Sequence, residues 1–266
     1  MQVLARTLNL KGMAFHRILP MTGRNPHEEH RVSTPLELLF DLTFVVAFGI
    51  AGNEMAHILA EGHFGTALAA YAFVMFGVCW AWINYSWFAS AYATDDWLFR
   101  LLTMAQMVGV VIFALGLPDV FKSMDEGNIL DNRVVVFGYM IMRLPLVALW
   151  LRAARHDAAR RPTALTYVKT LLAAQALWTV IMIVDLPIAA TFAAMSVPFA
   201  IELLGPYLAE RKGGTPWHPH HIAERYGLLT IIALGEGVIG TVASVSALVE
   251  EAGWNLDAIL VASAGI

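Results

Sequence analysis

The sequence contains little charge and almost no cysteine. Of its 266 residues, 14% are charged and 58% are hydrophobic, whereas about a quarter of the residues of a soluble domain are charged. The single cysteine, Cys79, excludes a disulfide within the chain and a cysteine metal cage. The formal net charge of −4, without any long basic run, argues against a nucleic-acid partner. A lipid bilayer is therefore the predicted surroundings of most of the chain.

The sequence also lacks the common signatures of catalytic and nucleotide-binding sites. It contains no G-x-S-x-G nucleophile elbow, no P-loop and no glycine fingerprint for a dinucleotide. Gly235-Glu236-Gly237 lies inside an apolar stretch that follows no strand pattern, so it does not form a phosphate-binding loop. We therefore predict that the protein is not an enzyme and needs no cofactor.

The first 35 residues do not form a secretory signal. Their apolar pieces are short and are interrupted by Lys11, His16, Arg17 and Pro20, and no small-residue cleavage pattern follows. We predict a basic cytoplasmic tail over residues 1–35 and a transmembrane helical domain over residues 36–266. An apolar run begins at residue 254 and stops at Ile266, short of the about 20 residues that a span needs, so we expect the domain to be truncated at its C-terminal end.

Seven stretches have the length and the apolar character of membrane-spanning helices. In chain order they cover residues 36–60, 66–92, 98–121, 134–152, 165–184, 188–208 and 222–248. The predicted fold is therefore an all-α, polytopic transmembrane helical bundle with seven complete spans and the start of an eighth.

Basic residues are distributed unevenly between alternate loops. The tail and the loops before the third, fifth and seventh spans hold 13 of the 17 Lys and Arg residues, whereas the opposite loops hold only Lys122 and Arg133. Short loops rich in Lys and Arg stay preferentially in the cytoplasm. This bias predicts a cytoplasmic amino terminus.

Polar and ionisable side chains fall inside or beside the predicted spans, where burial of a charge costs roughly 2.5–3.5 kcal/mol on insertion scales. Acidic and basic groups occur at matching depths, so they can pair and reduce this cost. Glu37 and Asp41 share one helix face because they are four residues apart. The candidate residues of a polar cavity are Glu37, Asp41, Asn84, Asp95, Asp96, Arg100, Arg143, Glu224, Arg225 and Glu236.

Two interpretations of these residues remain open. In the first, they line a cavity open to the cytoplasm, with Arg143 and Glu236 at its inner end, and the protein is a permease-like carrier of a small molecule or ion, coupled to protons through Glu236. In the second, they form salt bridges that only pack the helices, and the protein is a non-transporting scaffold or stress-adaptation protein. We favour the first interpretation.

Two histidine clusters provide a third, weaker hypothesis of a membrane-embedded metalloenzyme. His221 and Glu224 are one turn apart, and His27 could add a ligand from the tail. The tail order is His-Glu-Glu-His rather than HExxH, so it is not a zincin motif. We predict no metal site at these clusters, whose residues are His27, Glu28, Glu29, His30, His218, Pro219, His220 and His221.

Three segments resemble the low temperature requirement A (LtrA) family of bacterial membrane proteins. They are Thr34–Ala47 (TPLELLFDLTFVVA), the junction from Trp87 to Met107 and Glu224–Glu236 (ERYGLLTIIALGE). The resemblance implies a multi-pass protein of the bacterial inner membrane, with members that typically continue into further spans. Its recurrent polar positions correspond here to Glu37, Asp41, Asp95, Asp96, Arg100, Glu224, Arg225 and Glu236.

Overall fold

Long α-helices dominate the computed structural model, which describes residues 18–29 and 31–264. Residues 1–17, about half of the predicted tail, and His30 of the tail histidine cluster lie outside the described residues. Within the described part the helices are α2 (Pro35–Ala60), α3 (Phe64–Tyr92), α4 (Trp97–Leu115), α5 (Leu117–Glu126), α6 (Arg133–His156), α7 (Arg161–Ile183), α8 (Ile188–Glu210), α9 (Pro219–Ala252) and α10 (Leu256–Ala264).

Seven helical segments are long and apolar enough to cross a membrane, and each of the seven predicted spans overlaps one of them. The all-α, polytopic fold is therefore confirmed. The third span is longer than predicted, because α4 and α5 together cover Trp97–Glu126. They are separated by Gly116, where a Cβ atom would come within 2.8 Å of the Val135 backbone nitrogen. The nine-residue helix α10 follows the seventh span.

Two carboxylates begin helices at the same end of the bundle. Thr34 and Glu37 form a reciprocal capping box at the start of α2, and Pro35 occupies the first helical turn. Asp96 caps α4, because its side chain accepts a hydrogen bond from the Phe99 backbone N–H. The local sequence thus places an acidic group at the entrance of each of these two helices.

Helices α4 and α6 make the most extensive contact between two helices. A Cβ atom added at Gly109 would lie 2.6 Å from the Met142 backbone nitrogen, and one added at Gly138 would overlap the Phe113 backbone nitrogen. Only glycine allows the two backbones to approach this closely, as small residues commonly do between membrane helices. The two glycines therefore set the separation of α4 and α6.

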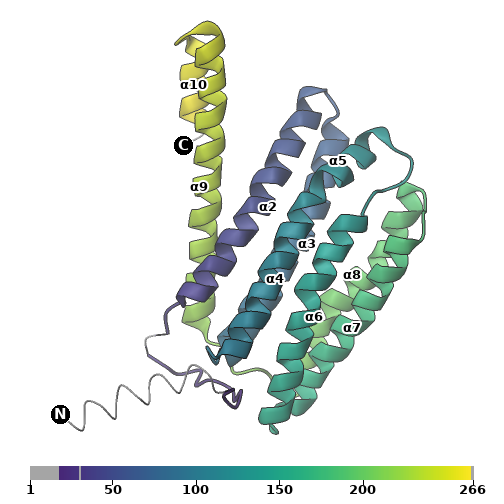
Figure 1. Ribbon diagram of the computed structural model, residues 1–266, viewed down its shortest axis with the longest axis vertical. Coiled ribbons are helices and arrows are strands. Elements are labelled where there is room, and N and C mark those ends of the chain that lie inside the picture. Colours follow the sequence, from purple (N-terminus) through teal and green to yellow (C-terminus); the bar gives the residue numbers. More distant parts are fainter. Residues whose placement is uncertain (1–17, 30, 265–266) are drawn as a thin grey trace, which may run out of the picture.

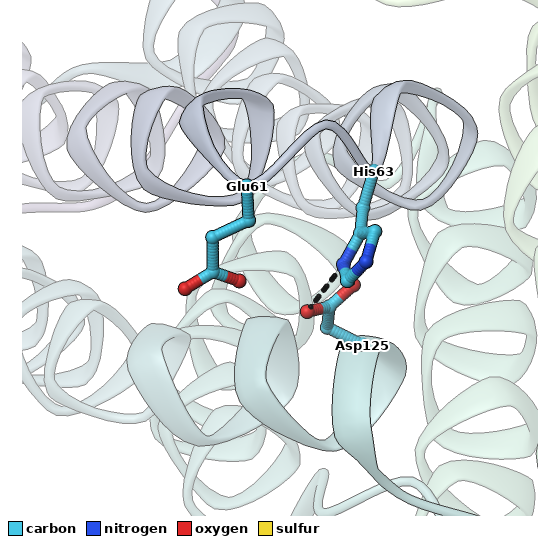
Figure 2. Close-up of side chains that lie close together, drawn as sticks. All are labelled: Glu61, His63 and Asp125. Carbon is cyan, nitrogen blue, oxygen red and sulfur yellow. Dashed lines mark hydrogen bonds and ion pairs between the residues drawn. The ribbon is translucent and has the colours of Figure 1, made fainter.

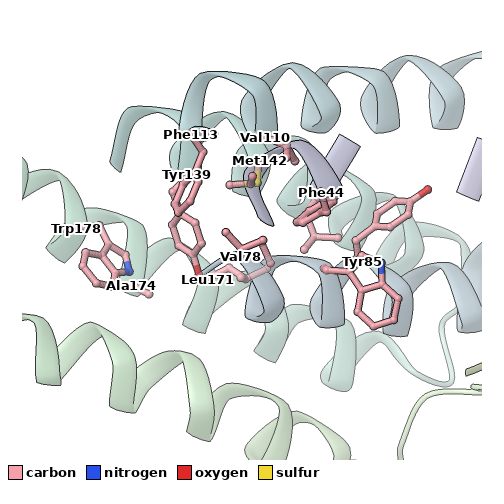
Figure 3. Close-up of a cluster of buried hydrophobic side chains, with 14 of the residues drawn as sticks. Phe44, Val78, Tyr85, Val110, Phe113, Tyr139, Met142, Leu171, Ala174 and Trp178 are labelled. Atoms are coloured by element: carbon pink, nitrogen blue, oxygen red, sulfur yellow. The ribbon is translucent and has the colours of Figure 1, made fainter. Parts of the chain in front are cut away.

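The centre of the bundle is aromatic and aliphatic (Figure 3). Phe44, Val78, Phe113, Tyr139 and Trp178 come from five different helices and are all buried. The outer surface is also apolar. It exposes many large hydrophobic side chains, which a soluble protein would keep inside; on α2 these include Leu39, Leu42 and Val46. An apolar exterior around the whole bundle is the pattern expected of a surface that faces lipid.

Helix α9 is peripheral to the other spans. It packs mainly against α2, with a smaller contact to α3. The two helices α2 and α9 lie side by side where they begin and diverge farther along, and α10 returns beside α9 (Figure 1). No residue in the most apolar window of α9 is buried. Apart from its contact with α10, the face of α9 that points away from α2 is therefore uncovered in the described chain.

One end of the bundle carries the loops that the sequence analysis found rich in basic residues, and we call it the basic end. Helices α2, α4, α7 and α9 begin there, and α3, α6 and α8 finish there (Figure 1). The described tail, residues 18–29 and 31–34, lies along this end, where the Arg24 backbone N–H donates to the Ala91 carbonyl at 2.9 Å.

Candidate functional site

Four ionisable side chains from α2 and α9 meet in the interior, close to the basic end. We call Glu37, Asp41, His221 and Arg225 the buried charge cluster, since each is at most 1% exposed. Arg225 donates to Asp41 through Nη2 at 2.5 Å and through Nε at 3.2 Å. Its Nη1 lies 3.3 Å from Glu37 Oε1, and His221 Nε2 lies 3.2 Å from the same oxygen. The cluster forms the polar part of the α2–α9 contact.

Aromatic residues of α3 also pack against the cluster, whose own residues come from α2 and α9. Trp82 Nε1 donates to Asp41 Oδ1 at 2.6 Å, which gives this carboxylate a neutral donor beside its arginine partner. The Arg225 guanidinium lies 5.5 Å from the centre of the Trp82 ring and 5.9 Å from that of the Tyr85 ring. These contacts are within the range of a cation–π interaction. The aromatic wall excludes water and thereby strengthens the electrostatic interactions inside.

The start of α2 positions the Glu37 carboxylate. Glu37 Oε2 accepts hydrogen bonds from the Thr34 N–H at 2.8 Å and the Thr34 hydroxyl at 2.9 Å. Its other oxygen, Oε1, makes no hydrogen bond within the described residues and faces His221 and Arg225. Asp41 lies one turn farther into the span on the same face, as the i, i+4 spacing predicted.

A second buried pair joins α6 to α8. Arg143 Nη2 lies 2.7 Å from Glu202 Oε2, and Tyr139 donates to the same oxygen at 2.5 Å. The Trp178 indole N–H donates to Glu202 Oε1 at 3.1 Å, so both carboxylate oxygens are engaged. Arg143 and Glu202 are each 1% exposed in their side chains. Glu202 was not among the candidate residues predicted from the sequence.

Glu236 does not lie beside Arg143 in this arrangement. Its carboxylate packs against Gly49 of α2, where an added Cβ atom would overlap Glu236 Oε1. Arg143 belongs instead to the α6–α8 contact. The two residues that the sequence analysis placed at one inner end therefore take part in different helix contacts, because sequence depth does not specify which neighbour a helix face meets.

The remaining candidate residues are distributed over the basic end. Asp95 pairs with Arg100 at 2.8 Å, and the Ser33 N–H donates to Glu224 at 3.3 Å. Asn84 donates to the Trp80 carbonyl of its own helix at 2.8 Å.

Asp96 ties the tail and α6 to the start of α4. Its carboxylate pairs with Arg152 and accepts from the Leu19 backbone N–H at 2.9 Å. Burial would raise the pKa of Asp96, but the hydrogen bonds from Arg152, Phe99 and Leu19 hold it below its usual value. Arg152 was not among the candidates. Its partner could be found only once α4 and α6 were known to be adjacent.

Arg31 fastens the described tail to the end of α3. It donates to the Ser90 carbonyl and, at 2.6 Å, to the Ala89 carbonyl. These are among the last carbonyls of the helix, where acceptors are only partly satisfied by the helix itself. Burial lowers the pKa of Arg31 to about 10, still far above neutral pH, so the guanidinium remains charged.

The histidines of the loop before α9 take separate roles. His218 caps α9: its Nδ1 accepts from the His221 N–H at 3.3 Å, while its Nε2 donates to the Glu28 carbonyl at 2.7 Å. His221 faces Glu37, and His220 and His27 are exposed. The spacing of His221 and Glu224 predicted a shared face, yet these two side chains contact Glu37 and Ser33 respectively.

At the opposite end of the bundle, Glu61, His63 and Asp125 bring one nitrogen and two carboxylate donors within 4.8 Å of one another (Figure 2). His63 Nδ1 lies 2.8 Å from Asp125 Oδ1, and this interaction raises the pKa of His63. The contact ties the α2–α3 loop to α5. This group could not be recognised in the sequence, because Asp125 is 62 residues from His63.

The chain is similar to known bacterial proteins. The family profile described as bacterial low temperature requirement A protein (LtrA) matches residues 32–266. A curated relative named as uncharacterized protein RA0937, from Rhizobium meliloti (strain 1021), is 28% identical over 224 residues. The match covers 80% of this chain and 51% of the relative, so the chain spans about half of the relative's length. No solved structure matches the chain.

Proposed function

Because the chain belongs to the LtrA family of integral membrane proteins, we propose that it acts as a permease-type protein of the bacterial inner membrane. Its amino terminus lies in the cytoplasm in this proposal, since the basic end carries most of the Lys and Arg residues. Its partners are the lipid bilayer and a small molecule or ion. We propose neither an enzymatic activity nor a nucleic-acid partner.

The composition of the buried charge cluster is the observation that carries the proposal. Glu37 and Asp41 supply two negative charges, and Arg225 supplies one positive charge. The remaining member, His221, neutralises the cluster only when it is protonated. Burial of a net charge at this depth is costly, so uptake of one proton or one small cation stabilises the cluster.

The cluster lies within a contact between two helices, so its charge state affects that contact. It lies where α9 joins α2, and α9 has little other contact with the bundle. A change from a net charge of −1 to neutrality alters the electrostatic free energy of this contact, while the core between α4 and α6 is unaffected. We propose that uptake of the proton shifts α9 relative to α2 and so couples the proton to transport.

A second candidate function is a scaffold that transports nothing. The pairs Arg143–Glu202 and Asp96–Arg152 favour it, because their carboxylates are fully engaged inside the bundle. Such pairs fix helix positions without a ligand. Under this alternative the buried charge cluster also only fixes the positions of helices.

Solute-driven proton flux distinguishes the two functions. The full chain is reconstituted in vesicles that contain a pH-sensitive dye, and a panel of small cations, amines, amino acids and organic acids is added. We expect at least one solute to drive proton movement, and we expect His221→Gln and Asp41→Asn to reduce that flux at least tenfold. Asp95→Asn, at an exposed ion pair on the same end, is the matched control and should keep the flux of the unaltered protein.

Each variant is first shown to be folded by its circular dichroism and its elution as a single species, so that a loss of flux is not a loss of folding. Flux that survives His221→Gln and Asp41→Asn contradicts the role of the cluster. Absence of flux for every solute supports the scaffold. A Glu236→Gln variant tests the carboxylate at Gly49 separately, which the sequence analysis favoured as the coupling group.

A further inference from the structure

A groove of about 710 Å³ opens at the basic end between α4, α6 and α7. Its wall at span depth is apolar and includes Leu98, Leu102, Leu151 and Leu165. Its rim at the loop level carries Arg155 and Arg161. A groove with an apolar wall below and a cationic rim above matches the chemistry of a lipid, whose acyl chains and headgroup lie in the same order across the interface.

The rim has an excess of positive charge because the nearby carboxylates are already engaged. Asp95 pairs with Arg100, Asp96 pairs with Arg152, and the side chain of Asp157 contacts Arg160.

Arg155 and Arg161, by contrast, are exposed and have no ion-pair partner among the described residues. Both therefore remain available to an anion that enters the groove.

The beginning of α7 adds a second attraction for an anion. Arg160 occupies its N-cap position, and no side chain caps the first-turn N–H groups. Uncapped amides and the helix dipole make such an end favourable for negative charge. The feature belongs to the same groove, since Arg161 is the first residue of α7 and also lines the rim.

The groove also lies at the level where lipid headgroups are expected. Trp97, the residue before Leu98 of the wall, is 43% exposed at the start of α4. Tryptophan side chains in this position are typical of the membrane–water interface. The wall residue Leu151 is 46% exposed, so the groove is open from the lipid side.

We propose that this groove binds an anionic glycerophospholipid of the leaflet at the basic end. The phosphate lies between Arg155, Arg161 and the first turn of α7, and the acyl chains follow the leucine wall. The inference is independent of the transport proposal, because it uses none of the residues of the buried charge cluster.

The basic rim and the groove also fit two roles that involve no lipid. Arg155 lies in the last turn of α6, where a basic side chain favours the negative end of the helix dipole without any ligand. Residues 1–17 precede Ile18, which lines the groove, so this segment is the alternative occupant that the experiment must distinguish. Charge favours the lipid over this segment, because residues 1–17 contain Arg6, Lys11 and Arg17 and no acidic residue.

Lipid-dependent thermal stability of the purified full chain tests the proposal. Delipidated protein in an uncharged detergent is titrated with dioleoyl phosphatidylglycerol, with dioleoyl phosphatidylcholine or with inorganic phosphate, and the unfolding midpoint is followed. We expect saturable stabilisation by phosphatidylglycerol alone. Arg155→Gln combined with Arg161→Gln should weaken its apparent affinity about 30-fold, since each basic residue contributes a factor of about five.

The matched control removes the same charge elsewhere at the basic end. Arg211→Gln combined with Lys212→Gln alters two exposed residues after α8 and should leave the affinity for phosphatidylglycerol within about twofold, given that they lie outside the groove. Equal losses in both double variants would overturn the site in favour of general surface attraction. Equal stabilisation by phosphatidylcholine or by inorganic phosphate would also overturn it. So would a preference for phosphatidylglycerol that arises only after residues 1–17 are removed.

Discussion

Arg143 and Glu202 show how a single charged residue is accommodated inside this bundle. Each side chain is 1% exposed, and the pair is supported by Tyr139 and Trp178. Removing a charge from water is costly, and the mutual attraction of the pair offsets that cost only while both partners are present. The stability of this region therefore depends on the pair as a unit.

Replacement of one partner should be far more damaging than replacement of both. Arg143→Met leaves the Glu202 carboxylate buried without its counter-charge, and we expect the free energy of unfolding to fall by about 3–5 kcal/mol. Arg143→Met combined with Glu202→Leu should recover most of that loss. The measurement is denaturant-induced unfolding in mixed micelles.

The matched control for this comparison is Arg133→Met, which breaks an ion pair whose side chains are 61% and 60% exposed. It should change the unfolding free energy by about 1 kcal/mol or less. A double variant that loses as much as Arg143→Met alone would show that the pair is not the source of the effect.

At the scale of elements, the bundle is organised around the close approach of α4 and α6. Gly109 and Gly138 bring the two backbones together, and the larger side chains of both helices pack to either side of this contact. Membrane helices gain little from the hydrophobic effect within lipid, so their association depends on such close packing. By comparison, the contact of α9 with α2 includes the ion pairs of Arg225 with Glu37 and Asp41, and α9 has no buried residue in its most apolar window.

A side chain at Gly138 should separate α4 from α6. A Cβ atom there meets the backbone of Phe113, which has no alternative rotamer, so the helices themselves must move. We expect Gly138→Val to lower the unfolding free energy by roughly 1–3 kcal/mol, the usual cost of overpacking. Thermal unfolding in detergent measures the effect.

Gly227→Ala in α9 provides the comparison, since nothing lies within 4 Å of the added methyl group. This variant should be as stable as the unaltered protein or slightly more stable, because alanine favours a helix interior. Equal destabilisation by both substitutions would contradict the role given to the α4–α6 contact.

At the scale of the whole molecule, the charged residues of the loops lie at the two ends of the bundle. The basic end carries the tail and the loops rich in arginine, and the opposite end carries Glu61 after α2, Asp125 in α5 and Asp185 between α7 and α8. Seven spans place the two ends on different sides of a membrane. The chain spans about half of the length of the curated relative that it matches.

The orientation of the molecule can be tested through its single cysteine. In a Cys79→Ala background, Asn128→Cys places a thiol in an exposed loop at the opposite end, and Lys212→Cys places one at the basic end. We expect a membrane-impermeant maleimide to label Asn128→Cys in spheroplasts, and to label Lys212→Cys only after the membrane is opened. The reverse pattern would contradict the proposed cytoplasmic amino terminus.

The sequence by itself determined the elements of this protein. Helix length and apolarity are local properties, so the seven spans could be predicted from about 20 residues at a time. The same holds for the helix entrance at Thr34–Glu37 and for the shared face of Glu37 and Asp41. These features depend on neighbours within one or two turns.

The tertiary structure alone decided which charges meet. Arg225 contacts Asp41 across 184 residues of sequence, and Arg143 pairs with Glu202 rather than with Glu236. Depth along a helix can be estimated from the sequence, but the rotation of that helix and the identity of its neighbour are set by packing, as the glycine contact with α4 sets them for α6, which carries Arg143. Pairing of buried charges follows from that packing, because each charge must find its partner among the side chains that the packed helices bring within reach.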